Sequence, residues 1–296
     1  MNHVNVTREH GLARGCTAAV FLIGAYFAFD PIETVLHAPI ATALDLHMMA
    51  HGEMGLLPYG ALMLVRFGLD LAVVAGVLAI LRHPRASFPL IGPKAFTLTM
   101  VGLAIGLLVM TGVILAIVAS GAATVAASVQ TPASAILYGT GWLAFDYLGA
   151  AGEELYGRVA VLLVAQTLIE WRGAILVSGL MFSVLQLDNP GATWVWLLRL
   201  FVQGMLLAYA VYRTGSVWWS IGYHTGWNWA SAPLFGAAGS GFLDQGHLFD
   251  FKPFGPSWIT GGAVGPEGSV YAFVAVLSAF GLLITITRAC RFKCRG

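Results

Sequence analysis

Charged residues are scarce in this sequence. They make up 10% of its 296 residues, while 58% are hydrophobic. Soluble domains contain about 25% charged and roughly 45–50% apolar residues, so this chain lacks the polar side chains that a water-facing globule needs. The mean hydropathy of +0.80 indicates the same. The composition excludes a soluble globular protein and predicts an integral membrane protein.

Net charge is also nearly absent. The 15 lysines and arginines are balanced by 14 aspartates and glutamates, which leaves a formal charge of +1. A protein that gathers nucleic acid needs an extended positive field. We therefore expect no nucleic-acid partner, and the lipid bilayer is the first partner that the sequence predicts.

Cysteine is almost missing, with Cys16, Cys290 and Cys294 as its three occurrences. An odd number near the chain ends excludes a disulfide framework. Cys290 and Cys294 have no further cysteine or histidine nearby, so they fall short of the four ligands of a structural zinc site. We expect free thiols.

Long hydrophobic runs, in contrast, are abundant. A helix needs about 20 mostly apolar residues to cross a bilayer, and the segment 134–169 is long enough to be either two spans or one kinked span. We expect an all-α polytopic membrane protein of about eight transmembrane helices, with spans at 15–30, 56–81, 95–119, 134–169, 173–187, 193–212, 216–235 and 269–287.

The distribution of lysine and arginine decides between the two readings of 134–169. Basic residues concentrate in the loops on the cytoplasmic side of a membrane protein. If 134–169 is a single span, most lysines and arginines of this chain lie on the same side of the membrane, whereas two spans would divide them between both sides. This predicts cytoplasmic termini and a multi-pass protein, most simply of the cell (inner) membrane. Missing side chains ease a kink, so we expect the long helix to bend near Gly149 or Gly152. The chain then divides into 1–133, a core at 134–235, and 236–296.

Several ionisable residues lie inside these spans, where lipid penalises charge. Such residues face the protein interior and usually have a task. Arg66 and Asp70 are four residues apart and are expected to pair on one helix face. Arg199 is expected either to extend its long stem toward the interface or to pair with an acid inside the bundle.

The run from Glu153 to Arg158 is the most informative of these groups. Glu154 and Arg158 lie one helical turn apart and can pair, while Glu153 points about 100° away around the helix. A carboxylate without a cationic partner is suited to take and return a proton as a general base. Asp146, seven residues earlier, shares the face of Glu153. The alternative is a helix end whose two glutamates are solvated.

A second polar pair follows in the seventh span. His224 and Asn228 are again one turn apart, among tryptophans. Alone they are typical of a satisfied packing pair. Together with an unpaired glutamate they supply an imidazole and an amide that can stabilise a developing oxyanion, as peptide hydrolysis requires.

In this order the residues resemble a known family. The run Glu153-Glu154-x-x-x-Arg158, then Phe182-x-x-x-Gln186, then His224-x-x-x-Asn228 is similar to the EExxxR, FxxxH and HxxxN motifs of the CPBP (CAAX-protease and bacteriocin-processing, Abi-type) family. The resemblance covers about 134–235. It implies a glutamate-dependent intramembrane endopeptidase that cuts a membrane-associated peptide or protein. Glu153 would activate water, Glu154 would be its partner held by Arg158, and His224 and Asn228 would stabilise the oxyanion. Phe182 would support this site. Asp146, on the same face as Glu153, is expected to be either a partner of Glu153 or a further negative charge beside it.

The sequence departs from the family pattern at Gln186, where the second motif has histidine. Glutamine can orient a water molecule but cannot titrate, so Glu153 would have to move the proton alone. The alternative is a catalytically impaired protein that binds a membrane peptide as an immunity or scaffold protein. The core keeps one histidine, fewer than the three protein ligands typical of catalytic zinc, so we expect no metal and no cofactor.

A weaker motif lies between the first two spans. His47, His51 and Glu53 resemble a metal-ligand spacing, but zinc proteases place glutamate directly after the first histidine, and Met48 stands there. We expect an interfacial helix with incidental histidines, in a loop at 30–55 that, like 236–268, is long enough for interfacial helices or a lid.

Overall fold

Helices build nearly all of the structure. The computed structural model describes residues 2–50, 52–82 and 94–293. The α-helices are α1 (Asn2–Ala43), α2 (Leu56–Leu81), α3 (Ala95–Ala119), α4 (Pro132–Glu154), α5 (Leu162–Leu168), α6 (Trp171–Val184), α7 (Trp194–Thr214), α8 (Trp218–Trp229), α9 (Ser257–Thr260) and α10 (Val270–Lys293). Shorter elements are the π-helices η2 (Leu155–Val161) and η3 (Ala230–Leu234), the 3₁₀ turns η4 (Gly262–Val264) and η5 (Pro266–Gly268), and the strands β1 (Met49–Ala50), β2 (Glu53–Met54), β3 (Ala123–Ala127) and β4 (Phe249–Pro253).

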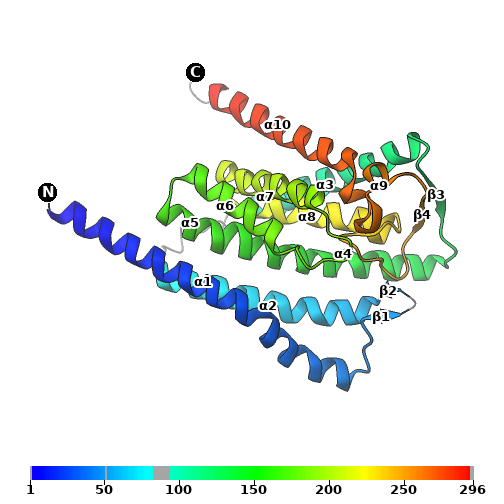
Figure 1. The fold of residues 1–296 in the computed structure, drawn as a ribbon, viewed down its shortest axis with the longest axis horizontal. Helices are drawn as coiled ribbons and strands as arrows, with labels where there is room; N and C mark the ends of the chain where they lie inside the picture. Colours follow the sequence, from blue (N-terminus) through cyan, green and yellow to red (C-terminus); the bar gives the residue numbers. More distant parts are fainter. Residues whose placement is uncertain (1, 51, 83–93, 294–296) are drawn as a thin grey trace.

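The architecture is that of a multi-pass membrane protein, as the composition predicts. Among the described residues, four helices are long and apolar enough to cross a bilayer: Gly11–Ala43, α2, α3 and α7. The apolar helices Trp171–Val184 and Val270–Thr285 are shorter. Each predicted span coincides with helix, while the number of crossings and the side of the termini stay predictions. Both chain ends lie at the same end of the bundle, opposite the strands (Figure 1).

The long segment is one continuous helical element, as predicted. Its irregular turn lies after Glu154 and not at Gly149 or Gly152, where a bend was predicted. The π-helix η2 joins α4 directly to α5, whereas Gly149 and Gly152 lie in regular α-helix. Their missing side chains admit α2 instead: a Cβ would lie 2.9 Å from the Met63 sulfur at Gly149, and 2.4 Å from Asp70 Oδ2 at Gly152. π-Helical turns occur frequently at functional sites, and η2 begins directly after Glu154.

Two apolar cores hold the bundle together. One lies among α1, α2, η2, α5 and α6 and includes Val77 and Val159, while the other lies among α3, α7, α8 and α10 and includes Ile114. Tyr156 of the first core and Trp227 of the second both border a central cavity. The cores thus enclose a polar interior between them.

Helices α3 and α8 pack with their backbones in direct contact. Gly102 and Gly106 of α3 face α8, and Gly222 and Gly226 of α8 face α3. A Cβ on Gly106 would lie 2.0 Å from the carbonyl oxygen of Tyr223. Small residues spaced by four permit such close approach in membrane helices. This contact fixes the position of α8, which carries His224 and Asn228.

We expect Gly106→Ala to reduce the free energy of unfolding by about 1–3 kcal/mol, because a methyl group there overpacks the contact with the α8 backbone. Gly112→Ala is the matched control, because no heavy atom lies within 4 Å of a Cβ at that position of α3. The control should be neutral, or stabilising by roughly 0.5–1 kcal/mol. Unfolding in mixed micelles, followed by circular dichroism, measures both. Equal effects would contradict the close contact.

The end of the bundle opposite the chain termini carries the strands. The pairs β1–β2 and β3–β4 are antiparallel, and Val125 of β3 faces Phe251 of β4. The interfacial helix expected around His47 is wrong: α1 ends at Ala43, and His47 leads into the β1–β2 hairpin. Extended backbone there lets the Met54 N–H donate to Leu243 O at 2.7 Å. The segment 236–268 contains α9 and two 3₁₀ turns. His51 lies outside the described residues.

Of the cysteines, Cys16 is a free, exposed thiol. Cys294 and the side chain of Cys290 lie outside the described part of the chain.

Candidate active site

A cavity of about 500 Å³ lies at the centre of the bundle. Side chains from α1, α2, α4, α6, α7 and α8, and from the segments around β2 and after α8, surround it. The predicted site residues that line it are Asp146, Glu153, Phe182, Gln186, His224 and Asn228. Motifs that are far apart in the sequence therefore meet around one space.

Glu154 and Arg158 form the buried base of the site. Glu154 is fully buried, and its Oε2 lies 3.2 Å from Arg158 Nε, as the one-turn spacing predicts. The other oxygen, Oε1, lies 3.0 Å from His224 Nδ1. One carboxylate thus holds both the arginine of the first motif and the histidine of the third.

Phe182 fills the space between these groups. The Arg158 guanidinium carbon lies 4.2 Å from the centre of the Phe182 ring. The edge-on His224 ring has its centre 5.5 Å from the same ring centre. Cation–π and edge-to-face aromatic contacts both favour fixed geometry. The phenylalanine of the second motif therefore helps to hold the imidazole in place.

Glu153 is turned away from the arginine and toward Gln186. The Gln186 amide Nε2 donates to Glu153 Oε2 at 3.4 Å. Asn189 in turn donates through Nδ2 to Gln186 Oε1 at 2.6 Å. This contact directs the Gln186 NH₂ group toward the carboxylate. Asn189 was not among the predicted site residues. Its position three residues after Gln186 is a spacing at which a turn brings two side chains together.

His224 and Asn228 approach the cavity from the same face of α8. His224 is buried and Asn228 is half-buried. Asp146 lines the cavity from α4, nearly two turns before Glu153, and is 5% exposed. The solvated helix end, considered as an alternative for the two glutamates, does not match the complete burial of Glu154.

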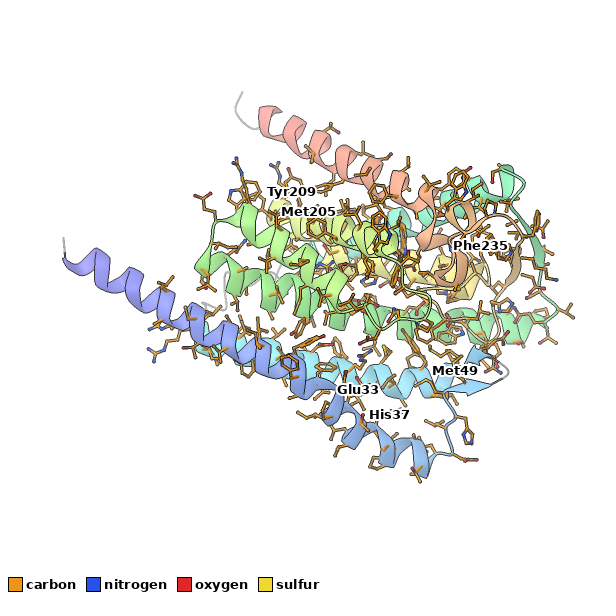
Figure 2. All side chains as sticks on the ribbon, viewed as in Figure 1. Glu33, His37, Met49, Met205, Tyr209 and Phe235 are labelled. Atoms are coloured by element: carbon orange, nitrogen blue, oxygen red, sulfur yellow. The ribbon has the colours of Figure 1, made fainter. Side chains whose placement is uncertain are left out.

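The predicted pair between Arg66 and Asp70 is wrong. Arg66 Nε lies 2.7 Å from Glu33 Oε2. Glu33 belongs to α1, which packs against α2 and continues past residue 30 (Figure 2). Asp70 points instead toward Gly152, where it is 7% exposed. A partner on another helix replaces the neighbour along the same helix.

Arg199 pairs with an acid, which was one of its two predicted outcomes. Its Nη2 lies 2.8 Å from Oε2 of Glu267, and its Nη1 donates to Gln203. Glu267 comes from η5, so this pair ties the loop after α9 to α7. Arg199 is 1% exposed and does not extend to the interface.

Within the described residues, no group of three or more histidine, cysteine, aspartate or glutamate side chains is arranged to hold a metal ion. The site therefore offers a carboxylate, an imidazole and amides as its chemical groups. That no metal or cofactor takes part stays a prediction.

Comparison with known proteins bears on the same segment. Residues 135–230 match the family model described as type II CAAX prenyl endopeptidase Rce1-like. No curated protein and no solved structure matches the chain. The match runs from the start of α4 to the end of α8, and so contains all three motifs. It supports a protease role in the membrane in general terms. Residues 135–230 of this multi-pass membrane protein are thus similar to the Rce1-like CAAX proteases, which confirms the CPBP resemblance that the motifs predict.

Proposed function

We propose that this protein is an intramembrane endopeptidase of the CPBP type, in which Glu153 activates water to hydrolyse a peptide bond of a membrane-associated peptide or protein. The observation that carries the proposal is the convergence of the three motifs on one cavity. A proton-accepting carboxylate and nearby hydrogen-bond donors are the groups that peptide hydrolysis needs. The cell (inner) membrane is the proposed location.

The first step forms the tetrahedral intermediate. Glu153 takes a proton from water while the water oxygen adds to the carbonyl carbon of the peptide bond. Gln186 lies beside the carboxylate and is suited to orient that water through its amide. Glu153 then returns the proton to the leaving nitrogen as the C–N bond breaks. The products are an amine and a carboxylic acid, and Glu153 regains its charge.

Negative charge on the carbonyl oxygen is stabilised by His224 and Asn228. With His224 Nδ1 donating to Glu154, its Nε2 is the nitrogen left for the substrate. The Asn228 amide lies one turn further along the same helix face. Preorganised donors of this kind contribute about 10²–10³ in rate.

A second candidate function is a membrane peptide-binding protein without catalysis, such as an immunity or scaffold protein. The observation that favours it is Gln186 itself, because an amide cannot share the proton that a histidine would accept. The cavity and its polar lining serve binding as well as hydrolysis.

Gln186→His distinguishes the two functions. If the protein is a protease that lacks one acid–base partner, the substitution should raise cleavage by about 10² or more. Gln166→His, the same change on the exposed side of α5, should leave the rate unchanged. Cleavage of quenched fluorescent transmembrane peptides by protein in lipid vesicles is the measurement. Absence of cleavage by wild-type and Gln186→His protein, with peptide binding retained, would favour the binding protein.

A further inference from the structure

The charges around the cavity do not balance. In the described part of the chain, the arginines near it are each paired with a glutamate, and these pairs are Arg66–Glu33, Arg158–Glu154 and Arg199–Glu267, at N–O distances of 2.7, 3.2 and 2.8 Å. The aspartates that line the cavity form no ion pair with these arginines. Two of them lie on segments that contact each other, α4 and the loop that follows η3.

Asp146 and Asp244 are these two residues. They line the cavity and are 5% and 7% exposed. Asp146 Oδ2 is buried and has no hydrogen-bond partner among the described residues. Tyr59 and Glu153 line the same cavity as the two aspartates. A buried carboxylate without a partner is costly, and a cation from outside the chain would supply the missing partner.

The loop that carries Asp244 is held firmly in place. Met54 of β2 donates to Leu243 O and accepts from Gln245 N–H at 3.0 Å. Trp142 of α4 donates through Nε1 to Gln245 O at 2.8 Å. Trp142 lies one turn before Asp146, so the same helix fixes both carboxylates.

The environment of Asp244 disfavours its charged form. Burial, and then the negative charge of Glu53, raise the pKa of the Asp244 carboxyl to about 8. A bound cation would restore its ionised form.

We infer that Asp146 and Asp244 form an acidic subsite that binds the side chain of a lysine or arginine in the peptide substrate. A guanidinium donates in a planar fork that suits two carboxylates. A metal ion is a poorer occupant, because the described residues hold no group of three metal-ligating side chains. That the bound peptide is also cut rests on the proposed function.

The distance between Asp146 and Glu153 also indicates which residue of the peptide would reach the subsite. Seven helical residues separate Asp146 from Glu153, which corresponds to roughly 10 Å along α4. An extended peptide covers that distance with about three residues. The basic side chain should therefore lie about three residues from the bond that the water activated by Glu153 attacks.

The test measures binding, so that it does not depend on cleavage. Purified Glu153→Gln protein is titrated with fluorescent leucine–alanine dodecapeptides that carry one arginine at successive positions, and with the same peptides carrying citrulline, an uncharged isostere. At the best position the arginine peptide should bind about tenfold tighter or more, since hydrogen bonds to charged groups are the strong ones. Adding Asp146→Asn or Asp244→Asn should each remove most of that advantage.

Asp45→Asn is the matched control, because the Asp45 side chain is 95% exposed and lies outside the cavity; the advantage should persist. Equal affinity for arginine and citrulline peptides at every position would overturn the inference, as would an advantage kept by both cavity variants. If Asp146→Asn does not fold, Asp244→Asn decides. Discrimination in binding without cleavage by the wild-type protein would keep the subsite and overturn the protease, and cleavage without discrimination would do the reverse.

Discussion

Glu153→Gln is expected to lower peptide-bond cleavage by a factor of about 10²–10⁴, because it removes the group that accepts the proton from water. Glutamine keeps the size of the side chain and a hydrogen bond to Gln186, so folding should be unaffected. Initial rates with quenched fluorescent transmembrane peptides, using protein in lipid vesicles, measure the loss.

Glu170→Gln is the matched control for that experiment. Glu170 precedes α6 and is exposed, away from the cavity. Its variant should cleave at the wild-type rate. Cleavage by Glu153→Gln at the wild-type rate would remove Glu153 from the mechanism, and the thermal unfolding midpoint would show whether a lower rate reflects misfolding.

Arg158→Met is expected to destabilise the protein by roughly 3–5 kcal/mol, because it leaves the fully buried Glu154 carboxylate without its cation. The double variant Glu154→Gln with Arg158→Met should recover much of this loss, since neutral groups replace both charges. Unfolding in mixed micelles measures each free energy.

Arg172→Met is the control for the arginine change. Arg172 is exposed on α6, where its guanidinium carbon lies 5.3 Å from the Trp171 ring centre. Exposed contacts of this kind contribute about 0.5–1 kcal/mol, so the control should lose far less than Arg158→Met. A double variant as unstable as Arg158→Met alone would contradict the account of an uncompensated buried charge.

The parts of the site that depend on one helix could be predicted from the sequence. The spacing of Glu154 and Arg158 fixes their pairing, and the rotation between successive residues turns Glu153 away from the arginine. His224 and Asn228 share a face of α8 for the same reason. The order of the three motifs, read as a resemblance to a family, predicted that these helices meet.

The parts that depend on contacts between elements could not be predicted in this way. Arg66 binds Glu33 because α1 continues past Pro31 beside α2, which hydropathy alone did not reveal. The link between His224 and Glu154 needs the positions of two helices. The partner of Arg199 comes from a short turn in a loop, where no periodic pattern exists.

The sequence also carries a packing signal in α3 and α8. The spacings Gly102-x-x-x-Gly106 and Gly222-x-x-x-Gly226 are the small-residue pattern of closely packed membrane helices. They predict a tight contact for each helix, although not which helix is the partner. The π-helix η2 has no comparable signal, since glycine suggests a kink and both nearby glycines serve packing against α2.

The most direct test of the account compares peptide termini in membranes from cells that produce the wild-type protein or Glu153→Gln, by mass spectrometry of labelled termini. If Glu153 activates water for cleavage, a set of new termini in membrane proteins appears with the wild-type protein and is missing with Glu153→Gln. The same set of termini in both membranes would contradict a glutamate-activated protease.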